Sequence, residues 1–116
     1  MSNPDCLFCK FVSGELDTDV VIETDKVLAF RDINPQAPTH ILIIPSKHIA
    51  TINDLTENDG EEIGNLYLVA KELAKAEGFD EEGYRVVMNC NAAAGQTVFH
   101  VHLHLLGGRL FDWPPG

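Results

Sequence analysis

The stretch FHVHLHLLGG, residues 99–108, holds three of the chain's five histidines at alternate positions, His100, His102 and His104. Side chains of a β-strand alternate between its two faces, so these imidazoles would share one face, about 6.6 Å apart. The Val and Leu residues between them would face the core. Polar strand faces more often carry Thr, Lys, Glu or Ser, and histidine changes its charge near neutral pH. The pattern therefore indicates chemistry; the alternative is a half-exposed strand whose polar face is histidine without a functional reason.

The rest of the chain predicts an α+β domain around this strand. Alternating and continuous apolar patterns predict five strands, of which the histidine strand, 99–106, is the last. Two strands lie within 20–32 and are joined by a turn at 24–26, and the others span 40–46 and 84–90. An apolar stripe at three- and four-residue spacing predicts one long helix from Thr56 to a C-cap at Gly78. A short N-terminal helix within 7–16 would end at Gly14. We expect a five-stranded antiparallel sheet with one long and one short helix.

Composition narrows the functional classes. The 116 residues include 18 acidic and 8 basic side chains, a formal net charge of −10. This charge repels a phosphodiester backbone, so polymeric nucleic acid is not an expected partner, although a pocket could still hold a small nucleotide. No run reaches the roughly 18–20 apolar residues of a membrane span, and the N-terminus lacks a signal-peptide pattern. We expect a single domain over 1–116, in the cytoplasm, without a membrane partner.

Two chemistries fit the histidine strand. Two or three imidazoles on one strand could bind zinc and activate water. Alternatively, a neutral imidazole could attack phosphorus and form a covalent intermediate. The stretch GQTV, residues 95–98, leads into the strand with a glycine and two side chains that can donate hydrogen bonds to phosphate oxygens. No Glu or Asp lies within the strand to act as the base of a zinc hydrolase. The sequence favours nucleophilic catalysis.

A family resemblance supports this interpretation. HVHLHLL, residues 100–106, resembles the His-φ-His-φ-His-φ-φ signature (φ, apolar) of the histidine-triad (HIT) superfamily. RDINPQAPTHILIIPSKHI (31–49) and the tail GGRLFDWPPG (107–116) resemble its Hint-like branch, the purine nucleoside phosphoramidases. The resemblance runs from about Cys6 to Gly116. It implies hydrolysis of purine nucleoside 5′-phosphoramidates, conjugates of AMP or GMP with an amine, to the nucleoside monophosphate and the amine.

The resemblance also implies roles for individual residues. The middle histidine, His102, would attack phosphorus and form a nucleotidyl-histidine, with its neutral tautomer set by a hydrogen bond to a carbonyl. His104 would contact the phosphate, His40 would pass a proton to the leaving amine, and His100 completes the catalytic set. Asp32 would accept hydrogen bonds from both ribose hydroxyls. The implied nucleotide-binding residues are Leu7, Phe8, Phe11, Phe30 and Ile33 around the base, Asp32 at the ribose, and Asn89, Gly95, Gln96, Thr97, Val98, His102 and His104 at the phosphate.

The cysteines suggest a metal rather than disulfides. Cys6 and Cys9 form a CxxC motif, whose spacing suits one metal ion, and a closed zinc site needs two further ligands. Many bacterial members of the superfamily use the histidine of KHI and the first triad histidine, which here are His48 and His100. The implied cofactor is one structural zinc ion, with none required for catalysis. Two reduced thiols without metal are the alternative, and Cys90 is expected to be a small buried residue.

The tail, residues 106–116, has no core pattern and is expected to pack outside its own sheet. In Hint-like proteins two protomers form a continuous ten-stranded sheet, and the tail brings Trp113 toward the partner's site. This implies a homodimer; a flap over its own protomer is the alternative for Trp113. Three functional alternatives remain: a dinucleoside-polyphosphate hydrolase of the same superfamily, a nucleotide-binding or scaffolding module with little turnover, and a zinc hydrolase built on the triad.

Overall fold

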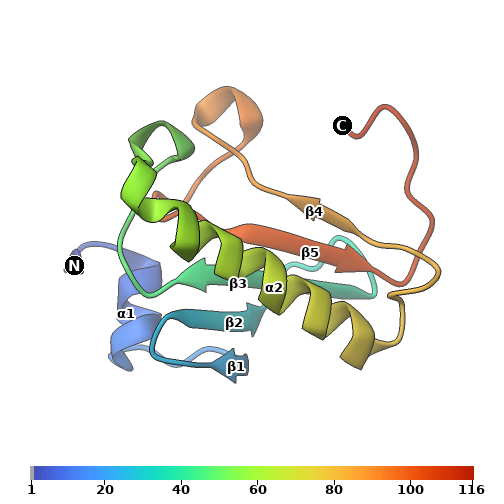
Figure 1. The fold of residues 1–116 in the computed structure, drawn as a ribbon, viewed down its shortest axis with the longest axis horizontal. Helices are drawn as coiled ribbons and strands as arrows, with labels where there is room; N and C mark the ends of the chain where they lie inside the picture. The colour runs from blue at the N-terminus through green and yellow to red at the C-terminus, as the bar shows by residue number, and fades with distance from the viewer. Residues whose placement is uncertain (1) are drawn as a thin grey trace.

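The computed structural model describes residues 2–116 and contains one antiparallel sheet of five strands in the order β1-β2-β3-β5-β4 (Figure 1). The strands are β1 (Val20–Glu23), β2 (Val27–Arg31), β3 (Thr39–Pro45), β4 (Arg85–Val87) and β5 (Leu103–Gly107). The helices are α1 (Leu7–Ser13) and α2 (Gly60–Glu77), with single 3-10 turns at Ile52–Asp54, Glu57–Asp59 and Ala92–Ala94. The predicted fold class is confirmed.

Both helices end where the sequence predicts, because glycine adopts the left-handed conformation that terminates a helix. Gly14 follows α1 with φ of 83° and Gly78 follows α2 with φ of 86°. The predicted start of the long helix is four residues early. Thr56 instead begins a 3-10 turn, in which the Thr56 N–H donates to the Asp59 carboxylate, and α2 starts directly after it at Gly60.

Side-chain alternation divides the core between the two faces of the sheet. Against α2 pack Val27, Ala29, Ile41, Ile43, Leu103 and Leu105, all buried. Against α1 on the opposite face pack Leu28, Phe30, Leu42 and Ile44. The long amphipathic helix therefore covers one side and the short N-terminal helix covers part of the other (Figure 1). The histidines of residues 100–104 lie on the α1 side.

The histidine strand is shorter than predicted. Its pairing with β3 begins at Leu103, opposite Ile43, so residues 99–102 lie outside the strand. If the same register continued toward the N-terminus of β5, Val101 would lie opposite Pro45. Proline has no N–H to donate to a ladder. Instead, the Val101 N–H donates to the carbonyl of Ile49 at 2.7 Å. The prediction that 84–90 is a strand is likewise too long, because β4 is limited to three residues.

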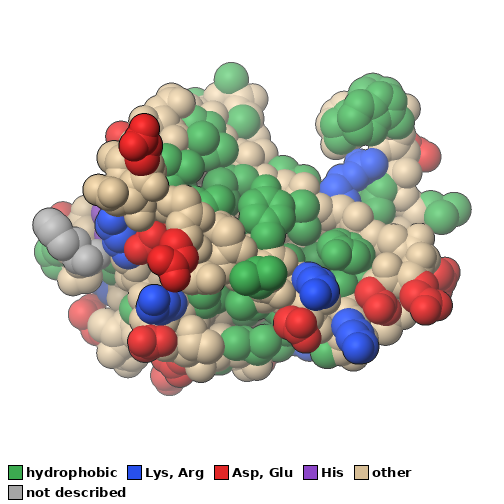
Figure 2. All heavy atoms as spheres, viewed as in Figure 1, with side chains coloured by type: hydrophobic (Ala, Val, Ile, Leu, Met, Phe, Trp, Pro, Cys, Tyr) green, Lys and Arg blue, Asp and Glu red, His purple; other side chains and the backbone are tan. Residues whose placement is uncertain are grey.

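The C-terminal tail leaves the end of β5 and extends away from the sheet (Figure 1). The guanidinium groups of Arg85 and Arg109 lie over the Phe111 ring, 5.2 and 4.2 Å from its centre. Beyond it, Trp113 is 81 % exposed, and apolar side chains gather at the end of the tail in Figure 2. Packing of this tail on a second copy stays a prediction. Among residues 2–116, no helix is long and apolar enough to cross a membrane.

Leucine truncation in α2 tests the core. Leu66 is fully buried against the sheet, whereas Leu68, two residues on, is 61 % exposed. Leu66→Ala should lower the free energy of unfolding by about 2–5 kcal/mol, because it removes buried apolar contacts and leaves a cavity. The matched variant Leu68→Ala should change it by about 0.5 kcal/mol or less. Urea unfolding measures both values, and equal losses in the two variants would contradict this assignment of the core.

Candidate active site and metal centre

A cavity of about 300 Å³ lies between α1 and the sheet. It is lined by Leu7, Phe8, Phe11, Thr18, Phe30, Arg31, Asp32, Ile33, Leu42, Thr97, Val98, His102 and His104. The structure thus brings together ten of the thirteen residues predicted to bind a nucleotide. Asn89, Gly95 and Gln96 do not line it.

Strand register explains how distant residues meet in this cavity. His104 of β5 pairs with Leu42 of β3, which pairs with Phe30 of β2, which pairs with Val20 of β1. His104, Leu42 and Phe30 thus form a row across the sheet, and all three line the cavity on the α1 side. Three aromatic rings, Phe8, Phe11 and Phe30, pack with centroids 5.2–5.9 Å apart and form its apolar wall.

The His102 ring has a defined tautomer. Its Nδ1 lies 2.8 Å from the main-chain carbonyl of His100, so Nδ1 carries the proton and donates it. The predicted hydrogen bond to a carbonyl is therefore present. Burial lowers the pKa of His102, and the ring is only 8 % exposed. The outcome is a neutral imidazole whose Nε2 has a free lone pair.

A second tautomer follows from the loop before β3. The main-chain N–H of Gln36 donates to His40 Nδ1 at 3.1 Å, so neutral His40 carries its proton on Nε2. His40 Nε2 lies 2.9 Å from His104 Nδ1 and donates to it. Neutral His104 must then carry its own proton on Nε2. Burial lowers the pKa of both rings, that of His104 to about 4, and keeps both neutral at pH 7.

His40 stands behind His104, since it is buried and does not line the cavity. Asp32 does line it, and its Oδ2 lies 3.5 Å from His40 Nε2 while Oδ1 accepts from the Asn34 N–H at 2.8 Å. Asp32, His40 and His104 have ligand atoms within 4.8 Å of one another, close enough for a metal ion. A metal on His40 Nε2 would move the His40 proton to Nδ1, against the Gln36 N–H. The hydrogen bonds therefore favour a hydrogen-bonded pair of neutral rings over a metal site.

The side chain of Gln96 stabilises the loop that precedes the histidines through hydrogen bonds to its main chain. Its amide group donates to the carbonyls of Ala50 and Val98 at 2.9 and 3.1 Å, and its Oε1 accepts from the Asn91 N–H at 2.8 Å. This side chain positions the loop and lies 5 % exposed. Thr97 and Val98, directly after it, reach the cavity.

Sequence reasoning missed three lining residues, Thr18, Arg31 and Leu42. Leu42 could have been found, because it lies two residues from His40 on the predicted strand 40–46 and therefore shares its face. Arg31 directs its guanidinium to Glu77 of α2, on the other side of the sheet, at 3.2 and 3.3 Å. Thr18 precedes β1 in an irregular segment, and no periodicity marks it.

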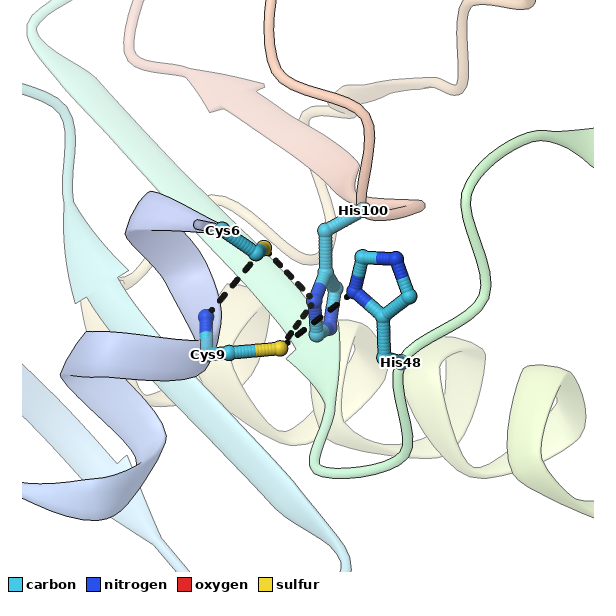
Figure 3. A group of neighbouring side chains, drawn as sticks. All are labelled: Cys6, Cys9, His48 and His100. Atoms are coloured by element: carbon cyan, nitrogen blue, oxygen red, sulfur yellow. Dashed lines mark hydrogen bonds between the residues drawn. The ribbon is translucent and has the colours of Figure 1, made fainter. Parts of the chain in front are cut away.

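The four predicted metal ligands come together beside this cavity (Figure 3). Cys6 and Cys9 come from α1 and its N-cap, His48 from the loop after β3, and His100 from the segment before β5. His100 Nδ1 lies 3.4 Å from Cys6 Sγ and 3.5 Å from Cys9 Sγ, and His48 Nδ1 lies 3.3 Å from Cys9 Sγ. Zinc bonded to sulfur and nitrogen in a tetrahedron separates such ligand atoms by about 3.5 Å.

The surroundings of this cluster suit a metal ion. His100 Nε2 donates to the carbonyl of Pro45 at 2.8 Å, which fixes the ring and leaves Nδ1 as the free lone pair. Main-chain N–H groups of Cys9 and Asn3 point at Cys6 Sγ and Cys9 Sγ, at 3.3 and 3.4 Å. Burial raises the pKa of the Cys9 thiol, and a bound cation would offset that cost of forming a thiolate. Cys6, Cys9, His48 and His100 can therefore hold one metal ion.

The metal cluster and the cavity share structural parts. His100 supplies Nδ1 to the cluster and its carbonyl to His102. Phe8, between the two cysteines, places its ring 6.0 Å from the His100 ring and 5.2 Å from the His102 ring, with an edge contact to each. The N-terminal helix is thus a wall of the cavity and a carrier of metal ligands at once.

Comparison with known proteins agrees with this architecture. Residues 13–110 match the family model of the HIT domain. The chain is 50 % identical over 103 residues to the purine nucleoside phosphoramidase of Escherichia coli K12, covering 89 % of this chain and 87 % of that protein. It superposes on a HIT family hydrolase from Legionella pneumophila with a TM-score of 0.95 and 60 % identity, covering 97 % of this chain and 100 % of the other. A histidine triad protein from Clostridium difficile gives a TM-score of 0.92 at 41 % identity, covering 97 % and 99 %. The chain belongs to the HIT domain family.

Metal analysis tests the cysteine–histidine cluster. We expect one zinc ion per chain in the wild-type protein and in Cys90→Ala, because Cys90 is outside the cluster. Cys6→Ala and Cys9→Ala should each retain less of it, because each variant removes one thiolate ligand from a four-ligand site. A chelator should lower the melting temperature of the wild-type protein and have a smaller effect on the two cysteine variants. Elemental analysis and calorimetry measure these quantities, and equal metal content in all four proteins would exclude this ligand set.

Acid unfolding tests the environment of His104. Burial and the neighbouring His102 and His40 lower its pKa from 6.5 to about 4, although Asp32 acts in the opposite direction. The unfolded chain therefore binds this proton first, and the free energy of unfolding should fall as pH drops from 6.5 toward 4. In His104→Gln this contribution is absent, so the loss over the same pH window should be smaller. Urea unfolding at several pH values makes the comparison, and parallel curves for the two proteins would refute it.

Proposed function

We propose that this member of the HIT domain family hydrolyses purine nucleoside 5′-phosphoramidates to a nucleoside monophosphate and an amine. The observation that carries the proposal is the neutral His102 ring, whose Nδ1–H is bound to the His100 carbonyl and whose Nε2 remains free at the cavity. The similarity to a purine nucleoside phosphoramidase supports the same reaction. A nucleotide fits the cavity's division into an aromatic wall and a histidine end.

In the first step, the lone pair of His102 Nε2 attacks the α-phosphorus and the P–N bond to the amine breaks. The product is a nucleotidyl-histidine, and His102 becomes positively charged. The carbonyl of His100 stabilises that charge through the existing Nδ1–H hydrogen bond. The leaving nitrogen must gain a proton to depart as an amine.

His104 and His40 hold a hydrogen-bond donor at the phosphate. In the proposed pose, His104 Nε2–H faces the phosphate end of the cavity and donates a hydrogen bond to a phosphate oxygen. His40 Nε2–H, 2.9 Å from His104 Nδ1, keeps His104 in this tautomer, so His40 acts through His104. The leaving nitrogen takes its proton from solvent, because a neutral ring that gave up its only N–H would become an imidazolate. In the second step, water attacks the same phosphorus, the P–N bond to His102 breaks, and the water's proton is released to solvent.

The remaining lining residues would orient the nucleoside. Asp32 lines the same cavity as the histidines and the aromatic wall. Its carboxylate oxygens accept hydrogen bonds, which suits the ribose hydroxyls. Phe8, Phe11 and Phe30 offer their apolar surface to the base. Metal held by the cysteine–histidine cluster would have four protein ligands, so it would stabilise the N-terminal segment and supply no reacting group.

The deciding experiment compares the wild-type protein with His102→Gln on an adenosine 5′-phosphoramidate that carries a fluorescent amine. Loss of the nucleophile should lower kcat by about a thousandfold or more. AMP binding should change only a few fold, because glutamine keeps a polar side chain of similar size. Rapid acid quench of the wild-type reaction followed by peptide mass spectrometry should locate an AMP group on His102.

Three outcomes would count against the proposal. Full turnover by His102→Gln would exclude nucleophilic catalysis by this residue. AMP binding without turnover by the wild-type protein would favour a nucleotide-binding module. Faster hydrolysis of a dinucleoside polyphosphate than of the phosphoramidate would favour that alternative reaction.

A further inference from the structure

The end of the cavity farthest from the histidines holds one polar side chain, Thr18. The row from His104 across Leu42 and Phe30 to Val20 spans three strand spacings, about 14 Å in total. Thr18 lies just before Val20, whose N–H donates to the Thr18 carbonyl at 3.0 Å. The next main-chain link, from the Arg31 N–H to the Asp19 carbonyl at 3.0 Å, fixes this segment against the end of β2.

Among the described residues that line the cavity, no other directs a polar side chain to that end. The guanidinium of Arg31 is paired with Glu77 on the α2 side of the sheet, so Arg31 borders the cavity through its main chain and the base of its side chain. The other polar lining residues, Asp32, Thr97, His102 and His104, lie at the assigned ribose and phosphate positions. Within residues 2–116, the Thr18 hydroxyl forms no hydrogen bond, which leaves it available to a ligand.

The order of groups in a nucleotide matches this layout. With the phosphate at His102 and His104 and the ribose at Asp32, the base lies along the aromatic wall with its outer edge toward Thr18. Adenine carries an amino group at C6 and guanine a carbonyl at the same position, and a hydroxyl can accept from the first or donate to the second. A pyrimidine is one ring shorter, so its edge would end before Thr18.

We propose that Thr18 is a specificity-determining residue that binds the C6 substituent of the purine through its hydroxyl. This inference rests on the proposed function for the placement of the phosphate. It gives the aromatic wall a polar end, so that the cavity selects purines with a hydrogen-bonding C6 group and accepts adenine and guanine alike.

The test uses three substrates with the same amine: the 5′-phosphoramidates of adenosine, guanosine and purine riboside, which has only hydrogen at C6. The wild-type protein should prefer the first two over purine riboside by about threefold to tenfold in kcat/KM, through KM, which is the effect of one hydrogen bond. Thr18→Val removes the hydroxyl at nearly constant shape and should bring this preference close to one. Thr18→Ser keeps the hydroxyl and should retain it.

Binding of the three nucleoside monophosphates, measured by calorimetry, separates this inference from the proposed reaction. If nothing is hydrolysed but the wild-type protein still prefers AMP and GMP and Thr18→Val does not, the reaction is wrong and the role of Thr18 stands. If Thr18→Val weakens all three ligands equally, Thr18 is only a packing residue and the inference fails. A preference for AMP and GMP that persists unchanged in Thr18→Val would also overturn it.

Discussion

The hydrogen bond from His102 Nδ1 to the carbonyl of His100 is the interaction on which the site depends. The His100 carbonyl is free to accept this bond because residues 99–102 lie outside the ladder, and pairing with β4 ends at Val87, opposite His104. Pro45 directs its own carbonyl to His100 Nε2. Without an N–H, Pro45 cannot extend the ladder beyond Ile43, and it also orients the ring of His100, the residue whose main-chain carbonyl fixes the His102 tautomer.

The histidine side chains at the phosphate end of the cavity carry no charge at neutral pH. The chain carries a net charge of −10, and the three rings at the phosphate end are neutral because burial lowers their pKa. Attraction for an anionic ligand must therefore come from oriented N–H groups rather than from cationic side chains. Oriented donors in a partly dehydrated cavity need little reorganisation when charge develops on a phosphate oxygen. A neutral histidine also keeps the lone pair that nucleophilic attack requires, which a charged ring would lose.

Much of this arrangement could be predicted from the sequence, because period-two alternation places side chains on defined faces. That alternation put the imidazoles on the face opposite Leu103 and Leu105. The CxxC spacing together with two motif histidines identified the four residues that can hold a metal ion. The loss of ladder pairing before Leu103 depends on which residue of β3 faces Val101, and register is a property of the assembled sheet. Gln96 looked like a phosphate ligand because its chemistry suits one, yet its amide stabilises its own loop. Thr18 lies in an irregular segment, whose path only tertiary contacts decide.

The position of Phe8 between Cys6 and Cys9, two of the residues that can hold a metal ion, has a thermodynamic consequence. Helix α1 has only 7 residues, too few to be stable by itself, so contacts with its surroundings must hold it. If a metal ion orders this helix, it also orders three residues that line the cavity, Leu7, Phe8 and Phe11. Linkage then requires reciprocity: a metal that tightens nucleotide binding is itself bound more tightly, by the same factor, when the nucleotide is present. Nucleotide affinities of this protein would thus have meaning only at a stated metal content.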